Sequence, residues 1–404
     1  MKTVAIISEY NPFHNGHLYQ ISRIREEFGK DTAIIAIMSG NYTQRGELAL
    51  MDKWARAQSA VLCGVNLVLE LPFPYSMSSA EFFARAGVHI ANSLNVVDYL
   101  SFGTETGDVE LLSAFAKRIE TEEFRKALAE ITAKKSNESL GYPKLIQATY
   151  ESIYGKEIDT DIFKPNNILA LEYIKALHES ASSIIPHTVK RAGADYSCEK
   201  ILRSESRQSA TAIRALINSG ECPSAFVPEK SFSVLKEEID NSHAPTDASK
   251  LDEAILSKFR LSHPTAECNI HDADGGLYNR LVKMSYEANT ISSLIDLSGT
   301  KKYTTARIRR AIWNSFFGVT SSDVKNPPAY TQVLALDNVG QVLLKGIKKR
   351  GAIKVLTKPS AQFSDVLAKR QKELSDNSDF IFQLSKPCSA PASSVYKRTP
   401  FVKK

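Results

Sequence analysis

Short runs of hydrophobic residues alternate with amphipathic stretches through the N-terminal part of the chain. An apolar run bounded by turn residues is typical of a buried strand, and apolar residues at every third or fourth position are typical of a helix. The pattern predicts strands at residues 4–7, 33–38, 67–71 and 96–102, and helices at about 17–28, 53–63 and 80–94. Strands separated by helices indicate an α/β fold with a parallel sheet that is covered on both faces.

The following segment extends this pattern. Residues 108–136 are charged and helix-prone, which predicts a helical insertion into the α/β fold. The α/β pattern then resumes with a helix capped by Asn166 and Asn167 and a strand at 183–189. The polar stretch 239–249 is the best linker candidate.

The chain is expected to form two domains, because its 404 residues exceed the usual size of one. Residues 1–240 form the predicted α/β domain. Residues 250–404 form a mainly helical α+β region, in which 250–317 predict helices. Within it, residues 332–355 predict short strands joined by glycines.

Composition narrows the class of protein. A hydrophobic share of 43% is sufficient for large buried cores. The five cysteines are scattered without a C-x-x-C pair, so neither a disulfide framework nor a structural zinc site is expected. The hydrophobic stretches are shorter than a membrane span, and Met1 and Lys2 lead directly into a strand. The sequence therefore predicts a cytoplasmic protein without a membrane partner.

Basic residues are concentrated in the last quarter of the chain. The formal net charge is +6, from 51 basic and 45 acidic residues. The clusters comprise Lys301, Lys302, Arg307, Arg309, Arg310, Lys345, Lys348, Lys349, Arg350, Lys369, Arg370, Lys397, Arg398, Lys403 and Lys404. A solvated surface explains any one of these clusters, but their accumulation in one region also fits contact with nucleic acid.

The most informative segment, residues 8–17, joins the first predicted strand to the first predicted helix. His14 and His17 are three positions apart, so they lie on one side of the first helical turn, where N–H groups and the helix dipole favour an anion. Gly16 has no side chain and leaves room for a ribose or base. H-x-G-H after an N-terminal strand is typical of nucleotidyltransferases and class I aminoacyl-tRNA synthetases, whose imidazoles stabilise charge developing at the α-phosphate.

The two histidines can also be interpreted as part of a metal site, since imidazole is a common zinc ligand. However, no cysteine or carboxylate lies at ligand spacing near them. The turn at Asn11 and Pro12 and the helical periodicity after His17 favour a nucleotide instead. No metal site is therefore predicted.

A second motif that can bind phosphate lies at residues 209–214. Ser209 and Thr211 provide hydroxyl groups at a helix start, and Arg214 follows one turn later. By itself, this motif is explained equally well as an ordinary helix cap. Ligands of open parallel sheets bind at the carboxyl ends of the strands, so the loops after the four predicted N-terminal strands are expected to share one cleft.

Together, these motifs form a series that resembles the tRNA(Met) cytidine acetate ligase family, a bacterial group. Its fold is α/β, a nucleotidyltransferase-like (HUP, Rossmann-like) parallel sheet, here with a helical insertion and a mainly helical α+β C-terminal region. The matching segments are 9–17, 39–41, 44–47, 52–57, 67–73, 79–81, 102–105, 165–169, 172–173, 190–191, 193–194, 209–214, 276–281 and 302–308. The chain departs from the family pattern where Ser197 and Cys198 replace a His-Asp pair, and at Leu48, where a proline is common.

The resemblance implies an ATP-dependent ligase with a two-step reaction. Acetate attacks the α-phosphate of ATP, which is expected to carry Mg²⁺, and acetyl-adenylate and pyrophosphate form. The N4 amine of the wobble cytidine (position 34) of elongator tRNA(Met) then takes the acetyl group to give N4-acetylcytidine. Because acetate is a poor electrophile, it must first be joined to AMP as a leaving group, and the enzyme contributes mainly alignment and charge neutralisation.

The resemblance also implies the site residues. His14, His17, Asp52 and Lys53 are the expected catalytic residues, with Lys53 and Arg45 stabilising pyrophosphate or acetate and Asp52 orienting the lysine or accepting a proton. A plain helix start explains Asp52 and Lys53 equally well. The expected nucleotide-binding residues are Ile7, Ser8, Glu9, Tyr10, Asn11, Pro12, Phe13, His14, Asn15, Gly16, His17, Leu18, Tyr19, Gln20, Gly103, Asn166, Asn167, Arg191, Ala192, Ser209 and Thr211.

Two other functions remain compatible with these residues. A nucleotidyltransferase acting on a small phosphorylated acceptor has no need of the basic C-terminal region. A non-catalytic RNA-binding or nucleotide-binding protein has no chemical reason to retain both histidines. If the chain is instead the tRNA-modifying ligase that the resemblance implies, the candidates for holding tRNA through its phosphates are Lys348, Lys349 and Arg350. The sequence does not indicate the oligomeric state.

Overall fold

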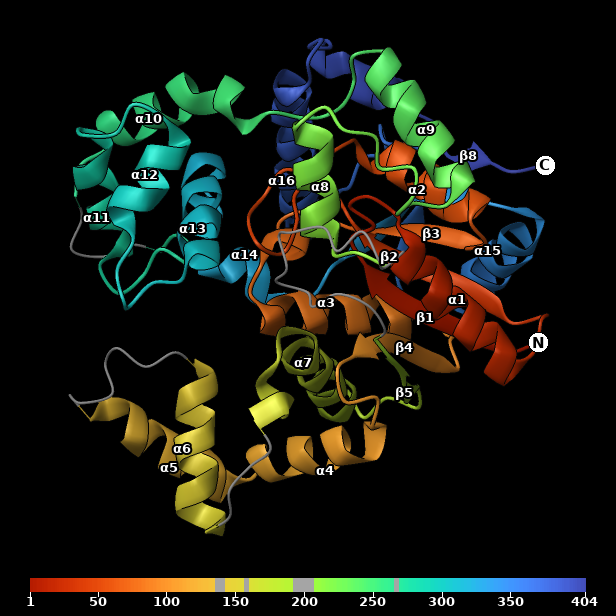
Figure 1. Ribbon diagram of the computed structural model, residues 1–404, viewed down its shortest axis with the longest axis horizontal. Helices are drawn as coiled ribbons and strands as arrows, with labels where there is room; N and C mark the ends of the chain where they lie inside the picture. The colour runs from red at the N-terminus through yellow and green to blue at the C-terminus, as the bar shows by residue number, and fades with distance from the viewer. Residues whose placement is uncertain (135–141, 156–159, 192–206, 265–268) are drawn as a thin grey trace.

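The computed structural model describes residues 1–134, 142–155, 160–191, 207–264 and 269–404 (Figure 1). Its centre is an eight-stranded sheet in the order β5-β4-β1-β2-β3-β6-β7, with β8 paired to β6. The strands are β1 Thr3–Ser8, β2 Ala33–Ser39, β3 Leu67–Leu71, β4 Tyr99–Thr104, β5 Ile185–Lys190, β6 Tyr330–Leu336, β7 Lys354–Leu356 and β8 Phe401–Val402.

Strands β1 to β5 are mutually parallel, which confirms the predicted α/β class. Strand β1 pairs with β2 on one side and with β4 on the other, so the direction of winding reverses there. Alternate residues of β1 enter different cores, Val4 and Ile6 on one face of the sheet and Ala5 and Ile7 on the other. The continuous apolar run of this strand is therefore explained by burial on both faces.

Helices cover both faces of the sheet (Figure 1). On one face, α1 (Asn15–Phe28) and α2 (Lys53–Leu62) contribute Ile21, Ile24 and Trp54 to the core. On the other face lie α3 (Ala80–Ser93), α7 (Pro165–Glu179) and α15 (Asn338–Arg350). The remaining α-helices are α4 Val109–Ile119, α5 Glu122–Ala133, α6 Tyr142–Tyr154, α8 Ala210–Asn218, α9 Glu229–Asp240, α10 Asp252–Arg260, α11 Leu277–Ser285, α12 Ile291–Ser298, α13 Thr305–Phe317, α14 Ser321–Lys325 and α16 Val366–Phe382.

The C-terminal part of the chain extends the same sheet. Strand β6 pairs antiparallel with β3, and both β7 and β8 run parallel to β6. The sheet therefore continues across the predicted boundary at residues 240–250. Between that boundary and β6, helices α10 to α13 form a unit with its own core, which also takes in Tyr42 and Phe73 from the loops after β2 and β3.

The prediction of short strands across residues 332–355 is wrong in its middle part, where helix α15 lies. Val339, Leu343 and Ile347 recur at every fourth position and pack on the sheet, which is a helical period. The glycine that suggested a turn, Gly340, has a packing role instead, because a Cβ atom there would lie 2.0 Å from the carbonyl oxygen of Asn66. The helix can approach the sheet this closely only without that side chain.

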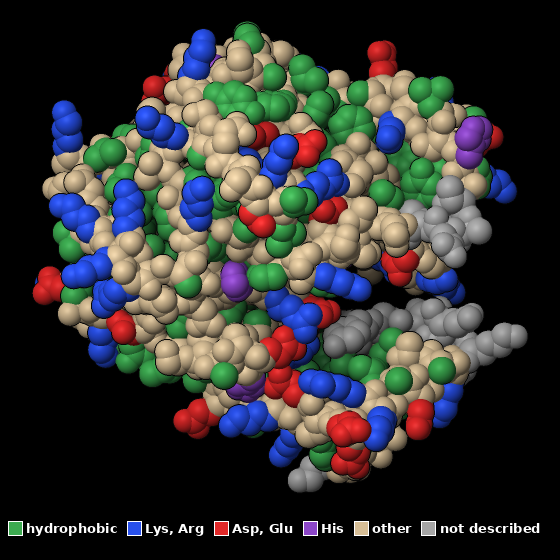
Figure 2. Space-filling view, turned by 180° about the vertical axis from the view of Figure 1, so that it is seen from behind, with side chains coloured by type: hydrophobic (Ala, Val, Ile, Leu, Met, Phe, Trp, Pro, Cys, Tyr) green, Lys and Arg blue, Asp and Glu red, His purple; other side chains and the backbone are tan. Residues whose placement is uncertain are grey.

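Helices α4 and α5 form the insertion predicted at residues 108–136, and α6 extends it beyond the predicted range. Viewed from behind, the surface is hollowed between this insertion and the α10–α13 unit, and Lys and Arg side chains are spread over most of the face (Figure 2). Across the described ranges, every helix is too short or too polar to span a membrane.

Candidate functional site

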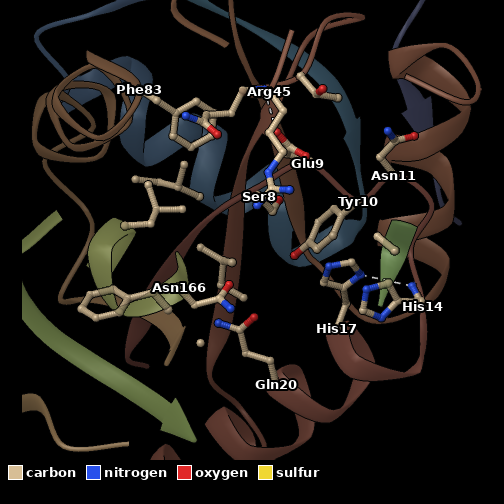
Figure 3. A pocket seen from close by; sticks show the side chains of 18 of the residues that line it. Ser8, Glu9, Tyr10, Asn11, His14, His17, Gln20, Arg45, Phe83 and Asn166 are labelled. Atoms are coloured by element: carbon tan, nitrogen blue, oxygen red, sulfur yellow. Dashed lines mark hydrogen bonds between the residues drawn. The ribbon is translucent and has the colours of Figure 1, made fainter. Parts of the chain in front are cut away.

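A cavity lies at the carboxyl ends of β1 and β4, where the strand order reverses. Open α/β sheets bind their ligands at such a switch point. Figure 3 shows the two imidazoles beside Tyr10, with Gln20 and Asn166 across from them and Arg45 and Glu9 on a further side. The lining residues are Ile6, Ile7, Ser8, Glu9, Tyr10, Asn11, His14, His17, Gln20, Thr43, Gln44, Arg45, Glu47, Phe83, Phe102, Gly103, Asn166, Leu169, Tyr173, Arg191, Ala210, Thr211 and Arg214.

The two histidines begin helix α1 as a reciprocal cap. The Nδ1 atom of His14 accepts a hydrogen bond from the backbone N–H of Gly16 at 3.0 Å, and the Nδ1 atom of His17 accepts one from the backbone N–H of His14 at 3.1 Å. An imidazole nitrogen that accepts carries no proton, so the hydrogen-bond pattern assigns the proton of each neutral ring to Nε2. The site therefore holds two Nε2–H donors at a helix N-terminus, where anions are favoured.

Both rings are neutral. Burial, reinforced by the charges of Arg191 and Arg214, lowers the pKa of His14 to about 3. Burial, together with His14 and Arg191, also lowers the pKa of His17 well below its usual value. The stacked rings, with centroids 3.7 Å apart, thus offer N–H donors without adding positive charge to the N-terminus of α1.

Close packing fixes the orientation of these rings. The Tyr10 ring meets His17 edge-on at 4.9 Å, and Phe13 lies 5.4 Å from His17. Both aromatic residues are buried. The space beside Gly16, expected to admit a ribose or base, is occupied by the His14 ring, because a Cβ atom on Gly16 would lie 2.8 Å from Cε1 of His14. The glycine therefore allows His14 to fold back and cap its own helix.

Arginines supply the positive charge of the cavity. The guanidinium of Arg214 donates to the carbonyl oxygen of Asn11 and to Glu47, both at 3.1 Å. The Arg191 side chain lies over Gly103, with its Cγ atom 3.4 Å from the position of a Cβ atom on that glycine. Arg191 thus occupies the place where the sequence predicted that a nucleotide approaches Gly103.

A buried arginine holds two walls of the cavity together. Arg56 is fully buried and donates to the carbonyl oxygens of Glu9 at 2.5 Å, Ser39 at 3.1 Å and Met51 at 3.2 Å, and also to that of Gly40. It thereby joins the end of β1 to the loop after β2. The same loop also lines the cavity, where the backbone N–H of Gln44 donates to the Glu9 carboxylate at 2.8 Å. Burial raises the pKa of Glu9.

The opposite wall comes from the start of α7. One carboxylate oxygen of Glu105 accepts from the side chain of Asn166 at 2.6 Å, and the other accepts from the backbone N–H of Asn167 at 2.9 Å. Asn167 in turn accepts from the backbone N–H of Glu105 at 3.0 Å and is fully buried. Asn166 therefore lies on the cavity wall, while Asn167 supports it from behind.

Comparison with known proteins places this geometry in a family. The model of the family described as HIGH Nucleotidyl Transferase matches residues 1–395. The tRNA(Met) cytidine acetate ligase of Acetivibrio thermocellus is 35% identical over 391 residues, which covers 93% of this chain and 92% of that protein. The one from Caldicellulosiruptor saccharolyticus is 37% identical over 362 residues, or 89% of this chain and 87% of that protein.

The chain belongs to the tRNA(Met) cytidine acetate ligase family. Two crystal structures of Thermotoga maritima TmcAL, each 29% identical, agree with the fold: the apo form I has a TM-score of 0.91, and the form II bound with alpha-thio ATP has a TM-score of 0.89. They cover 100% of this chain and 99% and 100% of their own. The resemblance found in the sequence is therefore confirmed.

In this member of the tRNA(Met) cytidine acetate ligase family, the structure brings part of the predicted site together. The predicted residues on the cavity wall are Ile7, Ser8, Glu9, Tyr10, Asn11, His14, His17, Gln20, Arg45, Gly103, Asn166, Arg191 and Thr211. Those in the described structure but not on this wall are Pro12, Phe13, Asn15, Gly16, Leu18, Tyr19, Asn167 and Ser209, besides Asp52 and Lys53. Ala192 lies outside the described residues.

Asp52 and Lys53 are not brought to the cavity but are buried behind it. The Nζ atom of Lys53 lies 2.7 Å from Glu70 and 2.6 Å from Asp379. Burial alone lowers the pKa of Lys53, but these two carboxylates outweigh it and raise the pKa above its usual value. Asp52 caps α2 and accepts from the side chain of Lys386 at 3.0 Å.

Other wall residues were not among those expected to bind the nucleotide. Gln44 and Glu47 belong to a segment that the family resemblance had marked, and Thr43 directly precedes it, but their side-chain chemistry gave no signal of a role. Phe83 and Tyr173 have the helical periodicity of ordinary core residues. Their place on the wall depends on the packing of α3 and α7 against the sheet, which periodicity does not distinguish from plain burial.

The candidate tRNA contacts Lys348, Lys349 and Arg350 lie at the end of α15, on the side of the sheet where β1 and β4 have their amino ends. Arg350 lines a cavity together with Met1, Thr3 and Asp98, which lie at or beside the amino ends of β1 and β4. The carboxyl ends of the same strands carry the cavity with the two histidines. Contact between Arg350 and tRNA therefore requires an RNA that reaches around the sheet.

Proposed function

We propose that this chain is an ATP-dependent tRNA(Met) cytidine acetate ligase. It activates acetate as acetyl-adenylate and transfers the acetyl group to N4 of the wobble cytidine of elongator tRNA(Met). The observation that carries the proposal is the pair of neutral imidazoles, His14 and His17, at the N-terminus of α1 on the wall of the switch-point cavity. Membership of the family, with about 35% identity across most of the chain, supports the substrates.

In the first step, a carboxylate oxygen of acetate attacks the α-phosphorus of ATP, and the bond from that phosphorus to the bridging oxygen of pyrophosphate breaks. The Nε2–H groups of His14 and His17 donate to phosphate oxygens on which negative charge develops. Donors held in advance by the capping hydrogen bonds need no reorganisation during the reaction, and each such donor contributes a factor of about 10²–10³ in rate. The charges of Arg191 and Arg214 attract the triphosphate.

In the second step, the cytidine N4 amine attacks the acetyl carbonyl carbon. The bond from that carbon to the AMP oxygen breaks, AMP leaves with the electron pair, and the amine releases a proton. ATP enters with Mg²⁺ on its phosphates as part of the substrate. A tRNA substrate is consistent with a cytoplasmic enzyme.

The decisive experiment is acetate-dependent exchange of labelled pyrophosphate into ATP in the absence of tRNA. Formation of acetyl-adenylate predicts that label enters ATP only when acetate is present. Exchange with another acid, or none with acetate, contradicts the proposed first step. Mass spectrometry of elongator tRNA(Met) after incubation with ATP and acetate tests the second step, since an acetyl group on another nucleoside contradicts the proposed acceptor.

A further inference from the structure

A second cavity adjoins the one that contains the histidines. It lies between the loop after β2, helix α8 and the helices α12 and α13 of the C-terminal unit. Its volume is about 590 Å³. Small-molecule sites commonly measure about 300–1,000 Å³, so a nucleoside fits within it.

The two cavities share one wall. Glu47, Thr211 and Arg214 line both of them. The Glu47 carboxylate is paired with Arg214 at 3.1 Å on α8 and with Arg309 on α13, so these ion pairs form the partition. A group held in the second cavity therefore lies directly behind residues that face the nucleotide.

The lining of the second cavity combines apolar surface with carboxylates. Leu48, Ile295, Ile312 and the edge of Trp313 provide the apolar part. An unstacked base is usually held against such aromatic and apolar side chains. Trp313 itself is fixed, because its indole N–H donates to the carbonyl oxygen of Gly46 at 3.1 Å.

The carboxylates in this cavity are hydrogen-bond acceptors. Asp247 accepts from the backbone N–H and the hydroxyl of Ser249 at 2.8 and 2.7 Å, and Asp252 accepts from the backbone N–H of Ile291 at 2.7 Å. An ionised carboxylate has about four acceptor positions, so both retain capacity for a further donor. The exocyclic N4 amine of cytosine is a donor that Asp and Glu side chains recognise.

We propose that the second cavity receives the acceptor nucleoside, an unstacked cytosine of single-stranded RNA. This inference rests on the proposed function, because only a two-step acyl transfer needs a nucleoside beside the nucleotide cavity. The base lies against the apolar wall, and its amine lies among the carboxylates of Asp247, Asp252 and Glu47 that line the same cavity. The amine and acetyl-adenylate then lie on the two sides of the wall that Glu47, Thr211 and Arg214 form between the cavities.

The test fills the second cavity from two opposite walls. Ala215 on α8 and Ser292 on α12 are exposed residues that line this cavity and are absent from the wall of the nucleotide cavity. Tryptophan at either position, Ala215→Trp or Ser292→Trp, occupies space that the base needs. The matched control is Leu297→Trp, on the same helix as Ser292, 40% exposed and outside the lining.

Three measurements are compared with the wild type: acetate-dependent pyrophosphate exchange without tRNA, single-turnover acetyl transfer to tRNA, and tRNA binding on filters. We expect exchange to be unchanged in all variants, because it does not need the acceptor. Transfer falls about 100-fold or more in both cavity variants, since a displaced reactant of this kind loses on that order of rate. Binding of tRNA weakens far less, because phosphate contacts dominate affinity for nucleic acid. The control retains all three.

Wild-type transfer rates in both cavity variants overturn this inference and leave the proposed function intact. A parallel loss of exchange and transfer also overturns it, because the cavity then serves the nucleotide instead. Failure of the wild type itself to catalyse acetate-dependent exchange contradicts the proposed function, which separates the two cases.

Discussion

Lys53 gives the sharpest test of whether a buried charge supports the fold or the chemistry. Its side chain is 3% exposed, and its ammonium group lies between Glu70 and Asp379, whose side chains are 2% and 6% exposed. Lys53→Met leaves two buried carboxylates without a counter-charge, and breaking a buried pair in this way costs about 3–5 kcal/mol. The matched control is Lys126→Met, which removes an exposed pair with Glu122 on one helix and costs at most about 0.5 kcal/mol.

The loss depends on pH in a defined direction. Burial already raises the pKa of Glu70 against the opposing effect of Lys53, and removal of Lys53 raises that pKa further. A carboxyl group whose pKa is higher in the folded than in the unfolded state destabilises the fold at every pH above the pKa that it has in the unfolded state. The free energy of unfolding of Lys53→Met is therefore expected to fall as the pH rises from 5 to 8. It is measured by urea denaturation, followed by circular dichroism. Equal stability of this variant and Lys126→Met refutes the reasoning.

The triple variant Lys53→Met, Glu70→Gln, Asp379→Asn distinguishes a structural from a catalytic lysine. It removes the ammonium group and neutralises both carboxylates, so most of the lost stability is expected to return. The asparagine keeps an oxygen that can accept the present 2.8 Å hydrogen bond from Asn41. We expect pyrophosphate exchange to return with stability. A stable variant without exchange supports the catalytic role predicted for Lys53 from the sequence.

Three further outcomes are expected. His14→Asn retains a capping side chain but lacks the imidazole, so pyrophosphate exchange falls about 10²–10³-fold, while thermal stability stays near wild type. Because burial holds the pKa of His14 near 3, its NMR signals do not titrate between pH 5.5 and 8.5 in the free protein, and a midpoint near 6.5 contradicts this. Gly340→Ala costs about 1–3 kcal/mol from the clash with Asn66, whereas Gly346→Ala, whose nearest neighbour is a flexible arginine end at 3.4 Å, stabilises α15 by up to about 1 kcal/mol in urea denaturation.

The parallel half of the fold could be predicted because its signals are local. The strand at residues 67–71 is apolar except for Glu70 and has turn residues on both sides, and the structure gives it the same bounds. The H-x-G-H motif likewise carries its chemistry within four residues. By contrast, the antiparallel addition of β6 beside β3 joins segments far apart in the chain, and no local pattern specifies that pairing.

The same distinction applies to the site. His14 and His17 could be placed from sequence because the first turn of a helix fixes their relation. The positions of Asp52 and Lys53 could not be predicted in this way, because their partners Lys386 and Asp379 come from the far end of the chain. Charge at a helix start is compatible with catalysis or with burial, and only the fold decides between them. Gly16 is similar, since the structure shows that its small size leaves room for the His14 ring, a contact that the sequence did not indicate.

Completion of the sheet by β6 has a consequence for biosynthesis. Strand β3 ends at Leu71, but its neighbour begins at Tyr330, so a nascent chain exposes an unpaired strand edge while the ribosome adds the residues between them. At about 5–20 residues per second this interval lasts roughly 10–50 s. An open edge of this kind is a template for association with other chains. Premature termination anywhere before β6 therefore yields a product prone to aggregate, not a smaller working enzyme.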